Sequence, residues 1–156
     1  MNQIVLYEPE IPPNTGNVAR TCAATNTALA LIEPLGFSLD DRYLKRAGLD
    51  YWQDVQLTSW ANWDTFQSHR SSQEEATLAL LSTRGNRCYT EIPIDKPVIV
   101  VFGPETRGLP RPMLDSHPDE SYRIPMMPGL RSLNLSNTVA LVLYDILRRQ
   151  GFPGMQ

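Results

Sequence analysis

Three short stretches of the sequence are rich in polar side chains and contain glycine or come soon after it. Such stretches could form a binding site. They are NTGNVAR at residues 14–20, FGPETRGLP at 102–110 and RSLNLSN at 131–137. Asn and Ser donate and accept hydrogen bonds, Glu and Arg carry charge, and glycine allows close approach to the backbone. None of the three contains His or Cys, the common catalytic bases and nucleophiles. Together they predict a small-molecule site.

Each stretch also has a purely structural interpretation. Asn14 is expected to be the N-cap of a helix, which would leave Arg20 in solvent. Glu105 suits a helix N-terminus, where an acid is favourable. One Ser or Asn suffices for a cap, however, so residues 131–137 hold more polar groups than capping requires. Arg20 is the only charge in residues 13–26, and a lone charge among small apolar residues needs a partner.

The apolar pattern around these stretches predicts an α/β fold. We expect strands at residues 3–9, 28–34, 54–60, 76–85, 97–105 and 122–126, and helices at 13–26, 40–49 and 133–149. Continuous apolar strands that alternate with helices are typical of a mostly parallel sheet flanked by helices on both faces. Ligands bind such sheets at the carboxyl ends of the strands, where the glycine-containing loops fall. Neither GxGxxG nor a P-loop motif occurs.

Length and composition restrict the class of protein. A chain of 156 residues suits a single domain spanning 1–156, and a net charge of −3 argues against nucleic-acid binding through bulk charge while allowing a local basic patch. The cysteines, Cys22 and Cys88, predict no disulfide framework and fit a reducing cytoplasm. We expect no signal peptide, no membrane span and no metal site. The helix at 133–149 is apolar nearly all round, which predicts contact with a second subunit.

Taken in order, N-x-G-N-x-x-R, FGPETRGLP and IP…RSLNLSN-x-x-A resemble the three motifs of the SpoU branch of the SPOUT RNA methyltransferases, over essentially the whole chain. YEPEIPPNTGN and RAGLDYW are similar to the minimal tRNA (cytidine/uridine-34) 2′-O-methyltransferases of that branch. The resemblance implies a C-terminal deep trefoil knot and an obligate homodimer. It also implies S-adenosylmethionine as cofactor, and methyl transfer to the ribose 2′-oxygen of the wobble nucleotide of certain leucine tRNAs.

The resemblance also assigns residues. The implied cofactor-binding residues are Leu81, Gly103, Ile124, Ser132 and Leu133, the implied catalytic residues are Asn14, Arg20, Glu105, Ser132 and Asn134, and Tyr144 is implied in dimer packing. The family proposal makes Arg20 the base, but arginine stays protonated in proteins, so an orienting role is the alternative. Glu105 is expected to hold Arg20 or a loop backbone rather than to act as base.

RNA binding must come from local positive charge. Arg42, Lys45 and Arg46, with Tyr43, Tyr51 and Trp52 nearby, predict phosphate contacts and stacking surfaces for tRNA. A solvated amphipathic helix is the alternative. Two other functions stay open: 2′-O-methylation at a different tRNA or rRNA position, and a non-catalytic RNA-binding factor on the same fold. The intact polar residues of the motifs argue against the second.

Overall fold

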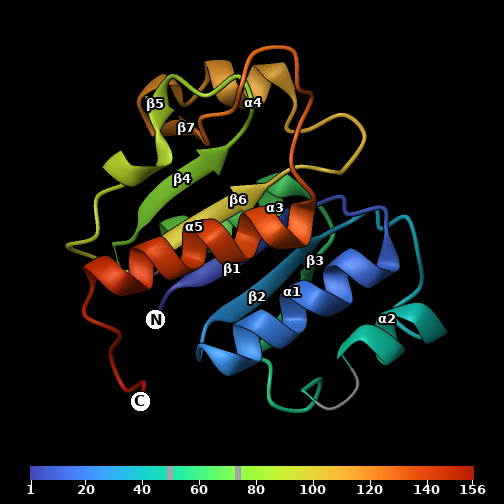
Figure 1. The fold of residues 1–156 in the computed structure, drawn as a ribbon. Coiled ribbons are helices and arrows are strands. Elements are labelled where there is room, and N and C mark those ends of the chain that lie inside the picture. Colours follow the sequence, from blue (N-terminus) through green and yellow to red (C-terminus); the bar gives the residue numbers. More distant parts are fainter. Residues whose placement is uncertain (49–50, 73–74) are drawn as a thin grey trace.

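The computed structural model describes residues 1–48, 51–72 and 75–156, in which strands and helices alternate (Figure 1). The strands are β1 (Gln3–Tyr7), β2 (Ala28–Ile32), β3 (Leu57–Trp60), β4 (Thr77–Leu81), β5 (Arg87–Cys88), β6 (Val98–Phe102) and β7 (Ser121–Arg123). The helices are α1 (Pro12–Ala24), α2 (Arg42–Gly48), α3 (Trp63–Ser71), α4 (Arg111–Asp115) and α5 (Leu135–Arg149), with 3₁₀ turns at Tyr89–Glu91 and Pro118–Glu120.

The strands form one 7-stranded sheet in the order β3-β2-β1-β6-β4-β7-β5. Each pairing between these strands is parallel. The central strand β6, VIVVF, is buried at every position, as a parallel strand covered on both faces should be. The predicted parallel α/β sheet is confirmed, although most strands end two to four residues before the predicted limits.

Helices cover both faces of the sheet. Ile4 of β1 belongs to a core with Val18 of α1 and Val139 of α5, while its neighbour Val5 belongs to a second core with Phe66 of α3. Successive side chains of a strand point to opposite faces, so the two cores lie on opposite sides of β1. Figure 1 shows α5 and α1 crossing one face together, with α2 outside α1 and α3 behind the sheet.

Helix α3 was absent from the sequence-based prediction. Its nine residues, WDTFQSHRS, are mostly polar and only Phe66 is buried, so no apolar period marks it. A capping signal was present, because the Asn62 side chain accepts a hydrogen bond from the backbone N–H of Thr65 at 2.9 Å and Asp64 lies in the first turn. Capping chemistry would therefore have predicted α3 where hydrophobic periodicity could not.

Helix α5 has one buried face and one outward face, so the prediction that it is apolar on all sides needs correction. Val142 and Leu143 are buried, whereas Leu141 and Tyr144 are 40% and 42% exposed. The exposed residues of α5 are Asn137, Leu141, Tyr144 and Arg148, so its outward face is apolar in the middle and polar towards both ends. Among the described residues, no helix has the length and apolar content needed to cross a bilayer.

Candidate active site

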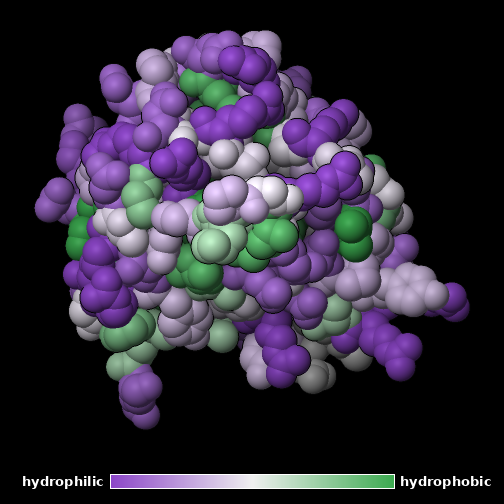
Figure 2. All heavy atoms as spheres, turned by 45° about the horizontal axis from the view of Figure 1, so that its top comes forward, coloured by the Kyte–Doolittle hydropathy of each residue, from purple (hydrophilic) through white to green (hydrophobic). Residues whose placement is uncertain are grey.

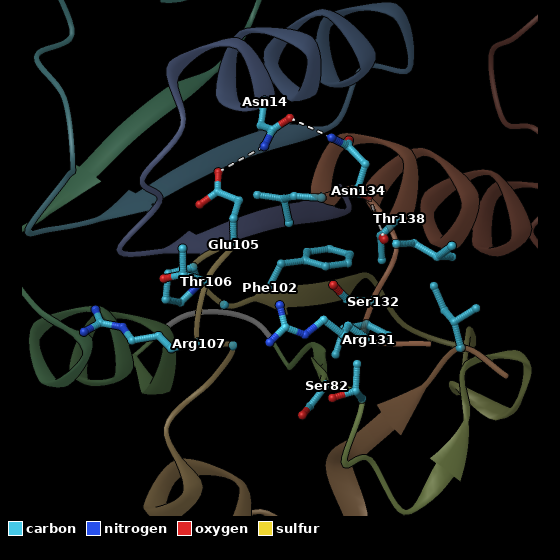
Figure 3. Close-up of a pocket in the computed structure, with 18 of the residues that line it drawn as sticks. Asn14, Ser82, Phe102, Glu105, Thr106, Arg107, Arg131, Ser132, Asn134 and Thr138 are labelled. Carbon is cyan, nitrogen blue, oxygen red and sulfur yellow. Dashed lines mark hydrogen bonds between the residues drawn. The ribbon is translucent and has the colours of Figure 1, made fainter. Parts of the chain in front are cut away.

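A cavity of about 900 Å³ opens at the carboxyl ends of β4 and β6, beside the segment that leads into α5 (Figure 3). Its walls come from the loop after β4, the loop after β6, the segment before α5 and the start of α1. These segments are far apart in sequence, but parallel strands bring their carboxyl ends to one edge of the sheet. The cavity therefore lies where the sequence predicts a site, at the carboxyl ends of the strands.

The structure brings most of the predicted site residues together in this cavity. The implied cofactor-binding residues all line it: Leu81, Gly103, Ile124, Ser132 and Leu133. Of the implied catalytic residues, Asn14, Glu105, Ser132 and Asn134 line it and Arg20 does not. Figure 3 shows Asn14, Glu105 and Asn134 converging along one wall, with Ser132 farther along the cavity.

The convergent polar residues form a hydrogen-bonded chain. The Asn14 side-chain amide donates to Glu105 Oε1 at 3.3 Å, and the Asn134 amide donates to Asn14 Oδ1 at 3.1 Å (Figure 3). Glu105 also accepts the backbone N–H groups of Glu10 at 2.9 Å and Ile11 at 3.2 Å. Its carboxylate therefore holds the backbone that enters α1, which is one of the two roles expected of it, and the chain links all three motifs.

The helix caps differ from the prediction. Helix α1 begins at Pro12, because proline is favourable at the first helical position, so Asn14 lies inside the first turn and is not the N-cap. Its buried side chain is free to reach across to the other motifs. Asn134 is the residue that caps α5: its Oδ1 accepts the backbone N–H groups of Ser136 at 2.9 Å and Asn137 at 3.3 Å. Asn134 thus serves both as a cap and as part of the cavity wall.

Gly103 is required by the fold of its own loop. A Cβ atom there would lie 2.3 Å from the backbone nitrogen of Leu109 and 2.4 Å from the carbonyl carbon of Gly108. Both are backbone atoms of the same loop, so they cannot move aside as a flexible side chain could. Any larger residue at position 103 would therefore change the loop as well as the cavity.

Arg20 lies on the exposed face of α1, which corrects the expectation of a charge enclosed by apolar residues. A helix turns about 100° per residue, so the buried positions Val18, Ala19 and Cys22 face the sheet while Arg20 faces away. Its guanidinium lies over the ring of Tyr51, with the central carbon 4.8 Å from the ring centroid. The Tyr51 ring, through this cation–π contact, is thus a partner for the lone charge of Arg20.

The predicted RNA-binding residues Arg42, Lys45 and Arg46 lie exposed on α2. Helix α2 packs against α1, so these residues and Arg20 belong to neighbouring elements at the same side of the molecule. The Arg42 guanidinium lies over the ring of Tyr43, also at 4.8 Å. Of the basic and aromatic residues that the sequence grouped together, Arg42 and Tyr43 are in direct contact, whereas Tyr51 contacts Arg20 and Trp52 packs against the core.

Three arginines that were not assigned to the site also line the cavity: Arg84, Arg107 and Arg131. Arg107 forms an ion pair with Glu8, and Arg84 donates a hydrogen bond to the carbonyl of Leu109 at 3.2 Å. Their position in the sequence could have identified them, because each lies in a glycine-containing loop that follows a strand.

The profile of the SpoU rRNA Methylase family matches residues 1–144. The chain belongs to this family. A tRNA (cytidine(34)-2′-O)-methyltransferase from Saccharophagus degradans is 49% identical over 155 residues, which cover 99% of each chain. The protein of the same name from Escherichia coli K12 is 46% identical over 155 residues, which cover 99% of this chain and 97% of the relative.

Solved structures of SpoU relatives share the fold. A putative RNA methyltransferase from Bacillus anthracis superposes with a TM-score of 0.91 at 46% identity, covering 100% of this chain and 98% of the other. A structure described as giving insights into the 2-OH methylation of C/U34 on tRNA has a TM-score of 0.90 at 42% identity, covering 97% of each chain. The SpoU methyltransferase AviRb from Streptomyces viridochromogenes, in complex with AdoMet, shares the fold at 19% identity and a TM-score of 0.82, covering 99% of this chain and 58% of AviRb.

The cavity of this SpoU family member fits S-adenosylmethionine, the cofactor of such methyltransferases. Its volume lies within the range of about 300–1,000 Å³ that is usual for small-molecule sites. Apolar side chains contribute much of the lining: Ile11, Leu81, Phe102, Ile124, Met126, Leu133 and Leu135. Such walls suit an adenine ring, and the loop backbones offer N–H and C=O groups to its polar edge.

One carboxylate, that of Glu105, lines the same cavity, and its oxygens accept the hydrogen bonds described above. Neither His nor Cys is among the residues that line it. Burial in the core raises the pKa of the Cys22 thiol to about 12, so this side chain stays protonated and inert. Within the described residues, no group of three or more His, Cys, Asp or Glu side chains could hold a metal ion.

Proposed function

We propose that this SpoU family member transfers a methyl group from S-adenosylmethionine to the ribose 2′-oxygen of nucleotide 34 of tRNA. One observation carries the proposal: the polar residues of the three motifs meet in a single cavity of cofactor size, where Asn14 bonds both Glu105 and Asn134. The near full-length identity to relatives named as tRNA (cytidine(34)-2′-O)-methyltransferases supports nucleotide 34 as the target.

When bound, S-adenosylmethionine supplies an electrophilic methyl group on a sulfonium sulfur. Leu81, Ile124 and Leu133 would hold the adenosine part by apolar contact, and Gly103 keeps the loop backbone close to it. The hydrogen-bonded chain through Asn14 fixes the walls relative to one another. Since methyl transfer requires in-line approach of the 2′-oxygen, this fixed geometry supplies much of the rate.

Arg20 would orient the ribose hydroxyl and pair with a neighbouring phosphate. A guanidinium stays protonated, so it suits orientation and charge pairing better than proton removal. Because Arg20 lies outside the cavity of its own chain, we propose that it acts on the cavity of a partner subunit in a homodimer. The exposed apolar residues Leu141 and Tyr144 on α5 support an interface on that helix.

The tRNA would present its anticodon loop to this dimer. Arg42, Lys45 and Arg46 on α2 are proposed to contact its phosphates, and Tyr43 and Tyr51 provide rings beside them. Leucine tRNAs are the proposed substrates, on the motif resemblance alone. The same resemblance supports a single 1–156 domain with a C-terminal trefoil knot, in a cytoplasmic enzyme.

The test is methylation of bulk tRNA by the purified protein with S-adenosylmethionine labelled in its methyl group. Nuclease digestion and mass spectrometry of the product should place the label on the ribose of nucleotide 34, in leucine tRNAs. Label at another position would redirect the proposal to a different RNA target. Tight tRNA binding without incorporation of label would favour the non-catalytic RNA-binding alternative.

A further inference from the structure

Some charged side chains around the cavity have partners within the protein, and others have no partner of opposite charge among the described residues. The charges without such a partner point to a second ligand. The charged residues that line the cavity are Arg84, Glu105, Arg107 and Arg131. Glu105 accepts hydrogen bonds from the backbone at Glu10 and Ile11 and from Asn14, and Arg107 pairs with Glu8. Both are therefore committed to contacts within the protein.

Arg84 and Arg131 differ from Arg107. Within the described residues, no carboxylate lies at ion-pair distance from either guanidinium. Arg84 donates to the carbonyl of Leu109 at 3.2 Å, which holds the group in place without cancelling its charge. Both side chains are exposed, so two positive charges without an acidic partner in the described part of the chain lie at the solvent-facing mouth of the cavity.

The position of these charges matches the backbone of an RNA substrate. Every ribose of an RNA chain lies between two phosphates, so a 2′-oxygen that enters the cavity brings phosphates to its mouth. Arginine is suited to them, because its planar fork binds phosphate oxygens in pairs. Figure 2 shows mostly hydrophilic side chains, with small hydrophobic patches, in the region of β5, β7 and the nearby loops.

We propose that Arg84 and Arg131 form a phosphate-binding site for the RNA segment whose ribose enters the cavity. This inference rests on the proposed function and adds to it a second contact region, separate from Arg42, Lys45 and Arg46 on α2. The cofactor carboxylate is a different anion that could occupy the site. The exposure of both arginines favours the RNA, since its phosphates remain at the solvent-facing mouth.

Binding of fluorescent tRNA to the full-length protein, without turnover, tests the site. The dissociation constant would be measured between 50 and 200 mM salt, concentrations over which about 10³–10⁵ in affinity is lost when many phosphates are contacted. Arg84→Gln and Arg131→Gln should each weaken binding and reduce the slope of log K against log salt by about 0.7, the value for one single-stranded phosphate. The slopes of Arg84→Lys and Arg131→Lys should stay near wild type, because the charge remains.

Lys96→Gln is the matched control, since it removes the same charge. Lys96 is exposed and precedes β6, so it lies at the end of the sheet opposite the cavity. The slope of log K against log salt for Lys96→Gln should therefore equal that of wild type. Equal slopes in all glutamine variants would overturn the proposal. So would an unchanged RNA slope with weakened S-adenosylmethionine binding by calorimetry, which would assign the arginines to the cofactor carboxylate.

Two variants at different loops guard against a folding defect in one of them, which thermal unfolding would reveal. The outcomes also separate this inference from the proposed function. If the wild-type enzyme methylates nucleotide 34 and the slopes of Arg84→Gln and Arg131→Gln equal that of wild type, only the phosphate-site proposal is wrong. Reduced slopes in a protein that methylates no tRNA would leave the phosphate site standing and remove the proposed activity.

Discussion

The cavity wall and the outer surface of α1 and α2 hold polar side chains in opposite ways. In the wall, Asn14, Glu105 and Asn134 are fixed by hydrogen bonds to one another and to backbone N–H groups. On the outer surface, Arg20 and Arg42 lie exposed over aromatic rings. A fixed wall suits one small molecule, whereas exposed cations on rings can adapt to a flexible RNA loop. The proposed methyl transfer uses both regions, and Arg20 lies outside the cavity of its own chain.

The largest expected effect comes from Arg20. Arg20→Ala should reduce methyl transfer by about 10²–10³, the usual loss for one preorganised electrostatic contact, while calorimetry shows unchanged S-adenosylmethionine binding. Arg20→Lys should also fail, because an ammonium lacks the planar fork. If Arg20 were a base, raising the pH would partly rescue the lysine variant. Near-normal turnover of Arg20→Ala would remove this residue from the mechanism.

A mixed dimer tests whether the two regions meet across subunits. One subunit would carry Arg20→Ala and the other Ile124→Trp, which fills the cofactor cavity. If Arg20 acts on the partner's cavity, the mixed dimer contains one complete site and regains about half the wild-type rate per dimer, since the two sites contribute equally. If Arg20 acts in its own subunit, both sites are defective and the mixed dimer stays inactive.

Tyr144→Asp should separate the two regions by weakening the proposed dimer. The substitution places a charge at a half-exposed position on the outward face of α5, where an interface would have to desolvate it. Light scattering across a dilution series should show dissociation at higher concentrations than for wild type, with a parallel loss of activity. A wild-type protein that is a stable, folded monomer at every concentration would rule the dimer out.

Asn134→Ala should affect both stability and the cavity. Loss of an N-cap costs about 0.5–2 kcal/mol, and the partner Asn14 also loses a hydrogen bond. Urea unfolding should show this decrease, and calorimetry should show weaker cofactor binding. Asn62→Ala, which removes the N-cap of α3 on the opposite face of the sheet, is the control. It should lower stability by a similar amount and leave cofactor binding unchanged; equal effects on binding would contradict a specific role for Asn134.

The smallest expected effect is at Tyr51. An exposed cation–π contact contributes about 0.5–1 kcal/mol, so Tyr51→Leu should slow methyl transfer about two- to fivefold, and Tyr51→Phe should keep the wild-type rate. In an Arg20→Ala background, Tyr51→Leu should have no further effect if the ring acts only by holding Arg20. An additive loss would show that Tyr51 has a separate role, such as stacking on RNA.

The sequence alone predicts the parallel α/β class and the end of the sheet at which the cavity opens. Continuous apolar runs mark buried parallel strands, and the glycine-containing loops that follow β4 and β6 must meet at one edge of the sheet. The assignment of Leu81, Gly103, Ile124 and Leu133 to one site came from the resemblance to the SpoU motifs, and all four line the cavity. The predictions of the strands and of the loops at their ends depend only on local sequence patterns, which the folded structure retains.

The hydrogen-bond partners and orientations of the polar residues depend on tertiary contacts. Asn14 and Asn134 both suit a cap, and only the start of α1 at Pro12 frees Asn14 to bond Glu105. Arg20 faces outward because the rotation of α1 is set by the apolar residues that it buries against the sheet. The unequal pairing of the cavity arginines depends on Glu8 and Leu109, which reach them from other loops. Such choices are made by contacts between distant segments, which no local sequence pattern encodes.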